Sequence, residues 1–532
     1  MKRLIPAVLA CLLLAACAAG PEAEVTPSSE PKPSFAPGPV FTDWSKLDDY
    51  QAPENHYTRY YAEYTDRLLP VEGGYGSALL PFAGAILATE WGMDEYRYGL
   101  VTTAGEVVCD PVYDSIYRPS YYDYDQERAV ELEDVLILTK TRLTEDYDPN
   151  TYQAGERCYT VAAADGSWVL EEEYRNSWTL SDGRLLLMDQ TGKLWFCDSE
   201  GRLERSPLDL EQSSLYGELF ALLGEDWMQE CVFEDGMFSL SSYAPETGGN
   251  DGCWLADART GQTKFLPDVS CCYGWSSGYG TAGNLDQTLY GYLDRSGTWV
   301  IPPQFRWANP FQGNYALVAL SDGTTALIDR TGAVVLEPQG DQWARMEASD
   351  GSVTYWDYYM CSAQWLVYGV YDETLQPVDH PAVGQYLDTL YAVAALREES
   401  TWTLYDGGDT WQFEAEGAEM LDDYADGRVT FRSQNGSGIY DCAAGTWIVP
   451  FGTYTYFNRT TDGAATVYCG SRMNSSGVFY DVLGEDGRCL ARTREGVLVW
   501  NGLIRVIDND SCAWLDGDGN VVFRWVFTLG TD

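Results

Sequence analysis

Two short glycine-rich motifs in the middle of the chain contain residue types that are used in catalysis and in nucleotide binding. Gly274-Trp-Ser276-Ser-Gly278 has the spacing of a nucleophile elbow, in which a strained turn between a strand and a helix exposes a reactive serine. Such a serine needs a histidine as its base, and the chain contains only His56 and His380. No helical pattern follows residue 278, so we interpret the motif as a glycine-rich loop between repeats.

The overlapping run Gly278–Gly283 fits the G-x-G-x-x-G pattern of dinucleotide-binding loops. That pattern requires a following helix, because the N-terminus of the helix holds the pyrophosphate. Residues 284–290 lead instead into an apolar run with strand character. The sequence therefore predicts no nucleotide cofactor at this motif.

Acidic side chains are numerous enough to suggest a calcium loop or a pair of catalytic carboxylates. Carboxylates alternate in residues 123–127, but Arg128 stands where an EF-hand loop needs glycine. Residues 516–520 lack the closing glutamate, because the twelfth position is Phe527. Among 81 acidic residues, adjacent ones such as residues 171–173 are expected by chance, and the spacing selects no glycosidase pair. No CxxC pair is present, so the spacing of zinc ligands is absent. Because each of the motifs above is also incomplete, we predict no catalytic, cofactor-binding or metal-ligating residues.

The formal net charge of −48 limits the possible partners. A polyanion of this size repels phosphate backbones and anionic headgroups, so we expect no nucleic-acid binding. Solubility alone accounts for the charge, and attraction for cationic or divalent partners is the alternative. Aromatic residues make up 14% of the chain, which favours β structure with a buried core. Trp275, Trp307 and Trp402 could stack on sugars, but their hairpin spacing favours the core.

The elements that must position all these residues are clearest in residues 290–318. A short apolar strand, Tyr290-Gly-Tyr-Leu-Asp294, is followed by a turn with Gly297 and by a second apolar run, residues 299–305. This order is typical of a β-hairpin, because glycine accepts the positive φ of the turn. The opening of the unit recurs over residues 326–338. A single hairpin is not stable alone, so we expect the units to stack on one another.

These residues resemble the WG-repeat family of bacterial proteins. The family pattern runs from a Tyr-Gly pair through an aspartate turn to Trp-Val-Ile-Pro-Pro-x-Phe and then to Phe-x-x-Gly. The match is close over residues 290–318 and partial elsewhere, and it implies an all-β repeat protein rather than any particular activity. The repeat-defining residues are Gly291, Asp294, Gly297, Trp299, Pro302, Phe305, Phe311 and Gly313.

The aspartate of the turn recurs at a nearly even spacing along the second half of the chain. Successive copies lie 34 to 43 residues apart at Asp257, Asp294, Asp329, Asp372, Asp406, Asp441, Asp481 and Asp516. Each unit offers three or four strands, which is the content of a propeller blade. The spacing does not distinguish a closed propeller from an open, curved array. About eleven units exceed the usual four to eight blades, so we expect two rings or one stack that does not close.

The N-terminal residues indicate export and a lipid anchor. Residues 1–17 combine Lys2 and Arg3 with an apolar run, as in a secretory signal. Leu14-Ala15-Ala16-Cys17 looks like a bacterial lipobox, which would make Cys17 the lipidated N-terminus, although an ordinary signal with an incidental cysteine is the alternative. Residues 18–41 read as a Pro/Ser-rich tether. Twelve further cysteines follow, and their pairing cannot be deduced from the sequence.

We therefore expect an all-β repeat array of antiparallel β-meander units, either propeller-like blades or an open curved stack, with a possible short helical lead-in. The tyrosines at positions 57, 60, 61 and 64 have a spacing compatible with that helix. The expected divisions are a lipoprotein signal peptide at 1–17, a tether at 18–41, a cap or lead-in at 42–97, degenerate repeats at 98–285 and WG-type repeats at 286–532.

The expected function is a binding or assembly module, lipid-anchored on the extracytoplasmic face of the cell membrane. Its partner would be an unknown extracellular protein or glycan, because repeat arrays create extended surfaces. We expect it not to be an enzyme. The alternative is an extracytoplasmic glycosidase or lyase that uses carboxylates on a propeller-like scaffold. A purely structural spacer is the third possibility.

Overall fold

Antiparallel strands dominate the computed structural model, with 60% of residues in strands and 3% in helices. The all-β prediction is therefore confirmed. The structure describes residues 59–64, 79–88, 94–102, 107–124, 128–142, 156–224, 227–243, 249–276, 278–340, 342–361, 364–390, 393–407, 409–462, 464–474, 477–493, 496–507 and 511–529. The signal peptide, Cys17 and the tether lie outside these ranges.

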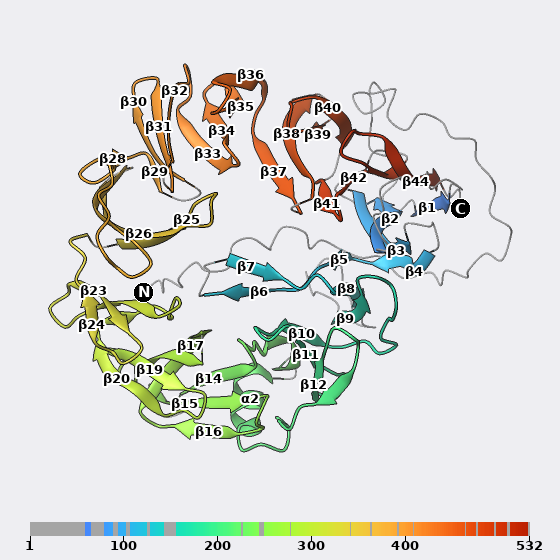
Figure 1. Cartoon of the computed structure of the whole chain (residues 1–532). Helices are drawn as coiled ribbons and strands as arrows, with labels where there is room; N and C mark the ends of the chain where they lie inside the picture. The colour runs from blue at the N-terminus through green and yellow to red at the C-terminus, as the bar shows by residue number, and fades with distance from the viewer. Residues whose placement is uncertain are drawn as a thin grey trace.

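Eleven blades follow one another around a single circuit, as a β-propeller (Figure 1). Blade 1 contains β1 (Arg59–Tyr64), β2 (Leu79–Ala88), β3 (Asp94–Thr102) and β4 (Val107–Tyr113). Blade 2 contains β5 (Ser115–Tyr117), β8 (Val135–Arg142) and β9 (Glu156–Ala163); blade 3 contains β10 (Asn176–Thr179), β11 (Leu185–Met188), β12 (Leu194–Cys197) and β13 (Leu203–Arg205). Blade 4 contains β14 (Met237–Tyr243), β15 (Asn250–Asp257) and β16 (Thr263–Leu266); blade 5 contains β17 (Val269–Ser276), β18 (Tyr279–Asn284), β19 (Tyr290–Asp294) and β20 (Trp299–Phe305).

The second half of the circuit is more regular, with four strands in every blade. Blade 6 contains β21 (Trp307–Ala308), β22 (Tyr315–Ala319), β23 (Thr325–Asp329) and β24 (Val334–Leu336); blade 7 contains β25 (Gln342–Glu347), β26 (Val353–Cys361), β27 (Gln364–Tyr371) and β28 (Tyr386–Leu387). Blade 8 contains β29 (Thr389–Leu390), β30 (Ala394–Glu398), β31 (Thr401–Asp406) and β32 (Asp409–Glu414); blade 9 contains β33 (Met420–Ala425), β34 (Arg428–Ser433), β35 (Gly436–Asp441) and β36 (Thr446–Tyr454). Blade 10 contains β37 (Phe457–Thr461), β38 (Thr466–Asn474), β39 (Gly477–Leu483) and β40 (Cys489–Thr493); blade 11 contains β41 (Leu498–Trp500), β42 (Leu503–Ile507), β43 (Ser511–Leu515) and β44 (Val521–Leu529).

The first and last strands close the circuit. β1 pairs antiparallel with β44, with Tyr60 opposite Leu529 and Tyr64 opposite Trp525, so blades 1 and 11 share one eight-stranded sheet. The expectation of two rings or a stack that does not close was wrong, because one closed circuit accommodates all eleven units. The short helix expected from the tyrosine spacing was also wrong over residues 59–64. Tyr60, Tyr61 and Tyr64 lie on β1, where aromatic residues suit a strand and β44 supplies the backbone partners, and Tyr57 lies outside the described residues.

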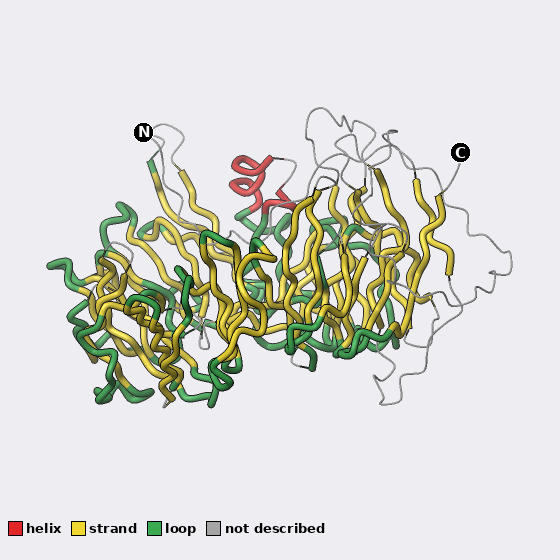
Figure 2. The backbone as a smooth tube through the Cα atoms, turned by 90° about the horizontal axis from the view of Figure 1, so that it is seen from above, coloured by secondary structure: helices red, strands yellow, loops and turns green. Residues whose placement is uncertain are grey.

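Two insertions interrupt the regular order. The hairpin of β6 (Ser120–Asp123) and β7 (Arg128–Glu131) lies between β5 and β8, and we call it the tyrosine hairpin. Two helices, α2 (Tyr216–Leu223) and α3 (Trp227–Glu230), lie between blades 3 and 4. Figure 2 shows the strands running through the thickness of the circuit and the helices at one of its faces. The sequence pattern had predicted neither insertion.

The core consists of buried apolar clusters that lie between neighbouring blades. Leu186 of blade 3 packs in one cluster with Phe238 of blade 4, and Ile301 of blade 5 packs in another with Ile328 of blade 6. Within the described ranges, every pair of adjacent blades shares such a cluster except blades 6 and 7. Most of the twelve cysteines that follow Cys17 are buried among these apolar side chains.

The aspartate turns have the geometry that the sequence predicted. Asp294 Oδ1 accepts hydrogen bonds from Ser296 N at 2.9 Å and from Thr298 N at 3.0 Å. Gly297 has φ +70°, the left-handed conformation that glycine adopts without strain. Asp329 repeats these contacts, accepting from Thr331 N at 2.9 Å and Ala333 N at 3.1 Å. The recurring aspartate therefore shapes the turn between the third and fourth strands of a blade.

Candidate functional site

One face of the propeller, which we call the turn face, carries the described turns that follow the first and the third strand in blades 3 and 5 to 11. Successive strands of a blade are antiparallel, so the turn after the first strand and the turn after the third strand lie at the same end. The aspartate turns of Asp294 and Asp329 belong to this face. The tyrosine hairpin also begins here, because it replaces the turn between the first two strands of blade 2.

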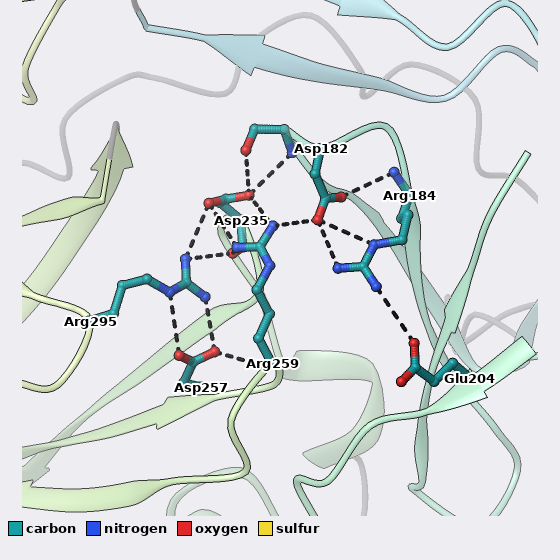
Figure 3. Close-up of polar contacts among 8 residues, drawn as sticks. Asp182, Arg184, Glu204, Asp235, Asp257, Arg259 and Arg295 are labelled. Atoms are coloured by element: carbon teal, nitrogen blue, oxygen red, sulfur yellow. Dashed lines mark hydrogen bonds and ion pairs between the residues drawn. The ribbon is translucent and has the colours of Figure 1, made fainter.

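Seven charged side chains from blades 3, 4 and 5 meet at the turn face (Figure 3). Four are acidic and three are basic, so their formal charges nearly cancel. We call this group the arginine–aspartate cluster, and it consists of Asp182, Arg184, Glu204, Asp235, Asp257, Arg259 and Arg295.

Two arginines bridge the three blades within the cluster. Arg259 Nη2 lies 3.1 Å from Asp182 Oδ2 of blade 3 and 3.0 Å from Asp235 Oδ1. Arg295 of blade 5 contacts Asp257 through Nη2 at 2.9 Å and Nε at 3.3 Å, which is a two-point contact. Its Nη1 also reaches Asp235 Oδ2 at 3.2 Å. Planar guanidinium groups suit such paired contacts, so each arginine fixes the turn of one blade against its neighbour.

The electrostatics of the cluster lower the pKa values of two of its carboxylates, Asp235 and Asp182. Burial raises the pKa of Asp235, but hydrogen bonds and charge from Arg259, together with hydrogen bonds from Ser181, outweigh that effect and lower it. The pKa of Asp182 is lowered in the same way by Arg184 and Arg259. A general acid needs a raised pKa, so neither carboxylate is suited to donate a proton at neutral pH. The cluster is therefore a clamp that holds three blades in register.

The tyrosine hairpin lies beside the arginine–aspartate cluster and next to blade 4. Figure 1 shows β6 and β7 extending over the interior of the circuit, and Figure 3 shows their ribbon next to the cluster. Burial raises the pKa of Tyr121, with a further contribution from Asp123 and a smaller one from Asp235. Burial and then Glu234 raise the pKa of Tyr124 to about 12. In Figure 3 the ribbon of the hairpin passes near Asp235, which agrees with the contributions of Asp235 and Glu234 to the pKa values of these two tyrosines.

The two sides of the tyrosine hairpin differ in burial. Tyr121 and Val130, which lie opposite each other, are half-buried on the side toward blade 4. Tyr122 and Ala129, also a pair, are exposed on the other side together with Glu131. The Tyr122 side chain is 53% exposed, and its ring lies 5.0 Å from that of Tyr124 in an edge-on contact. The hairpin is thus anchored by one side and presents the other to solvent.

The repeat-defining residues serve the blade rather than a site. Phe305 and Phe311 are buried at 2% and 1% exposure, in the cluster between blades 5 and 6. Trp299 packs half-buried against the cluster of blades 4 and 5, and its Nε1 lies 3.4 Å from Asp268 Oδ2. Gly313 has φ +58° in the turn before β22, and Pro302 is exposed on β20. Gly291 lies where β19 and β20 approach most closely.

The two glycine-rich motifs lie within blade 5. The interpretation of the first motif as a loop between repeats was wrong, because residues 274–276 end β17 and Ser276 pairs with Tyr279 of β18 in the same blade. Ser276 ends β17, is buried, and donates a hydrogen bond to the Phe311 carbonyl at 2.6 Å, so it is not an exposed nucleophile. Most of the run Gly278–Gly283 lies on β18. Of the three tryptophans considered as sugar contacts, Trp275 and Trp402 are buried, as the spacing favoured, whereas Trp307 is 37% exposed.

Neither the clamp nor the tyrosine hairpin was predicted from the sequence. Residues 123–127 were considered only as a calcium loop. The available signal for the hairpin was the extra chain length between the first two strands of blade 2, where blades 3 and 5 to 11 have a short turn. The pairing of Arg259 with Asp182 spans 77 positions and leaves no local signal.

Comparisons with known proteins agree with the repeat. Residues 290–322 match the family described as WG containing repeat. No curated protein matches the chain. Neither described helix has the length and hydropathy needed to cross a membrane.

Several solved structures are similar at low identity. PorZ, a bacterial surface component of the type-IX secretion system of Porphyromonas gingivalis, is 9% identical over 77% of this chain, with a TM-score of 0.20. The similarity covers 53% of PorZ, so this chain matches about half of that protein's length. AztD from Citrobacter koseri is 10% identical, with 70% of this chain and 96% of AztD covered and a TM-score of 0.24. Dihydro-heme d1 dehydrogenase NirN is 10% identical, with coverage of 72% and 78% and a TM-score of 0.28.

Proposed function

We propose that this protein is an extracytoplasmic binding or assembly module, anchored to the membrane by a lipid on Cys17, whose ligand is an extracellular macromolecule. The observation that carries the proposal is the tyrosine hairpin, which is fixed on one side and exposed on the other. Its partner contact would centre on Tyr122. Tyrosine is enriched at such contacts because it offers a large rigid surface with a polar end.

The clamp supports this role by stabilising the surface beside the hairpin. Asp235 belongs to the clamp and contributes to the pKa shift of Tyr121, and Figure 3 shows the ribbon of the hairpin near it, so the arginines that fix Asp235 also stabilise that surface. A preorganised surface binds with a smaller loss of conformational entropy than a flexible one. The hairpin can thus act as a rigid docking element on the propeller.

The charge of the chain restricts the ligand. At a net charge of −48, a neutral or cationic protein or glycan is compatible with close approach, whereas an anionic polymer is repelled. The lipid anchor would place the turn face outside the cell, at the end of the tether of residues 18–41. Labelled fatty acid should enter the wild-type protein and not the Cys17→Ala variant, and equal labelling would remove the anchor from the proposal.

A capture experiment tests the hairpin. Full-length protein in detergent micelles is immobilised and exposed to a glycan array and to extracellular proteins of the producing cell. We expect Tyr122→Ala to weaken capture of the bound ligand about tenfold or more, as for a central tyrosine of an interface. The matched control is Tyr243→Ala, because Tyr243 is 45% exposed but lies at the far end of β14 from Asp235. Equal capture by both variants and the wild type would contradict the proposal.

A further inference from the structure

A small cavity opens at the turn face between blades 7 and 8, and we call it the blade 7–8 cavity. Its volume is about 10 Å³, measured as the space for the centre of a water molecule, which is room for about one water or a group of that size. Its lining includes Glu347, Trp356, His380, Tyr405 and Asp406. Aromatic rings and carboxylates therefore surround a space for one small group.

The aromatic part of the lining is rigid. Trp356 is 3% exposed, and its Nε1 donates to Thr354 Oγ1 at 2.9 Å. The His380 ring lies between two others, with its centroid 4.8 Å from Trp356 and 5.2 Å from Tyr405. Burial lowers the pKa of His380, which keeps the imidazole neutral at pH 7. The rings thus offer π surfaces and no positive charge.

The acidic part of the lining carries a fixed negative charge. Asp406 accepts from Ser349 N at 2.8 Å, from Ser349 Oγ at 2.6 Å and from the Tyr424 hydroxyl at 2.7 Å. All three donors are neutral, so they orient the carboxylate without cancelling its charge. Glu347 stands at the exposed rim, where it pairs with Arg345 at 3.2 Å, and the charge of Glu347 is therefore partly compensated.

We propose that the blade 7–8 cavity binds the primary ammonium group of a lysine side chain on a partner polypeptide. An ammonium group has about the size of a water molecule, carries the charge that Asp406 attracts, and is stabilised over aromatic rings. The net charge of −48 would draw a basic segment toward this face. The inference rests on the proposed function and adds to it the chemistry of the partner.

The size of the cavity makes the inference selective. Three methyl groups on the nitrogen make the ammonium group much larger than one water molecule, so a trimethylated lysine should be excluded from the cavity. An open aromatic cage, by contrast, accepts quaternary ammonium groups. A carboxylate of the same size should be repelled by Asp406 and Glu347. The cavity is therefore expected to distinguish ligands by methylation state as well as by charge.

Calorimetric titration of the full-length protein with defined probes tests the inference. The probes are a short lysine-containing peptide with blocked termini, the same peptide with trimethylated lysine, and putrescine as a free amine. We expect the lysine peptide to bind at least about tenfold more tightly than the other two. Equal binding of the trimethylated peptide, or tighter binding of putrescine, would overturn the assignment to a lysine of a polypeptide.

Two substitutions connect the binding to this cavity. Asp406→Asn removes the charge but retains an oxygen for Ser349, and should weaken the lysine peptide about tenfold. Glu347→Gln, at the exposed rim, should weaken the binding of this peptide about two- to threefold without disturbing the core. The control is Glu171→Gln, because Glu171 is exposed between blades 2 and 3, and it should change nothing. If Asp406→Asn fails to fold, the Glu347→Gln variant and the comparison of the unmethylated with the trimethylated peptide still test whether the cavity binds lysine. Unchanged binding in Glu347→Gln would overturn the inference. Absence of lysine binding alongside capture that depends on Tyr122 would overturn this inference and leave the proposed function standing.

Discussion

At the scale of single residues, the aspartates of the turns act as ligands for backbone N–H groups. Asp189 shows this most fully, because one carboxylate oxygen accepts from Thr191 N at 2.8 Å and Lys193 N at 3.0 Å, and the other accepts from Trp195 Nε1 at 2.9 Å. An ionised acceptor makes stronger hydrogen bonds than a neutral one. Asp189, which lies in the turn after the second strand of blade 3 and not at the repeated position, therefore contributes to stability through its charge as well as its shape.

The protonation of Asp189 gives a prediction about pH. Burial raises its pKa, but hydrogen bonds from Trp195, Thr191 and Lys193 outweigh burial and lower the pKa below its usual value. A carboxyl group with a lowered folded-state pKa stabilises the fold above the unfolded-state pKa of about 3.9, and this stability is lost as the pH falls through the folded-state pKa. Asp189→Asn should therefore lower the free energy of unfolding by about 1 kcal/mol at pH 7, after allowance for solvent screening, and by less at pH 3.

Denaturant titrations at several pH values between 7 and 3 measure this difference. The control is Asp251→Asn, since Asp251 is exposed on β15 away from any aspartate turn. Its effect should stay within about 0.5 kcal/mol at every pH. A difference between Asp189→Asn and the wild type that persists unchanged at pH 3 would show that the charge of Asp189 is not the stabilising feature.

At the scale of the strand, the Tyr-Gly pair of β19 and the two prolines of β20 together shape the pairing of these two strands. Opposite Gly291, β20 bulges outward, because Tyr290 pairs with Phe305 while Tyr292 pairs with Ile301. Pro302 and Pro303 occupy the bulge, and proline has no N–H to donate to a neighbour. β20 is the outer edge of blade 5, so these prolines also protect the edge from pairing with another chain.

The bulge explains why the second residue of the pair is glycine, and it gives a prediction. A Cβ on Gly291 would overlap the Ile301 carbonyl oxygen and lie 2.8 Å from Pro303 N. Gly291→Ala should therefore lower the free energy of unfolding by about 1–3 kcal/mol, measured by denaturant titration. Gly517→Ala is the matched control, because no atom lies within 4 Å of its added Cβ, and it should be neutral or slightly stabilising. A similar loss in both variants would argue against the close approach.

Residues that act within one turn or one strand pair could be predicted from the sequence, and those that act between blades could not. The turn of Asp294 and Gly297 depends on five consecutive residues, so it can be recognised from the sequence. The contact of Arg259 with Asp182 depends on how far one blade is rotated against the next, which no residue type specifies. The number of blades in the circuit depends on the same rotation, and the pairing of β1 with β44 could not be foreseen for that reason.

At the scale of the whole molecule, the circuit has one atypical joint. Blades 6 and 7 share no buried apolar cluster within the described ranges. Tyr315 of blade 6 meets Tyr355 of blade 7 edge-on at 6.4 Å, and Trp343 stacks on Tyr355 at 5.7 Å, with all three rings only half-buried. The chain that joins the two blades is held by Asp357, which is fully buried and accepts from Gly340 N at 2.7 Å. This joint relies on ring contacts and hydrogen bonds where the others bury aliphatic side chains.

The atypical joint predicts where the circuit opens first. Separating two blades costs the free energy of the apolar surface that they bury together, so the joint with the least buried apolar surface opens most readily. The alternative opening point, between β1 and β44, would break a ladder of five paired residues. Hydrogen exchange followed by mass spectrometry in low denaturant should therefore show β24 and β25 exchanging earlier than β20 and β22, which flank the apolar cluster of blades 5 and 6.

Ile328→Ala, which weakens that cluster, is the matched test of the same reasoning, because it should bring β22 toward the exchange rate of β25. Simultaneous exchange of all four strands in the wild type would mean that the joints are equivalent and that buried apolar surface does not set the order of opening.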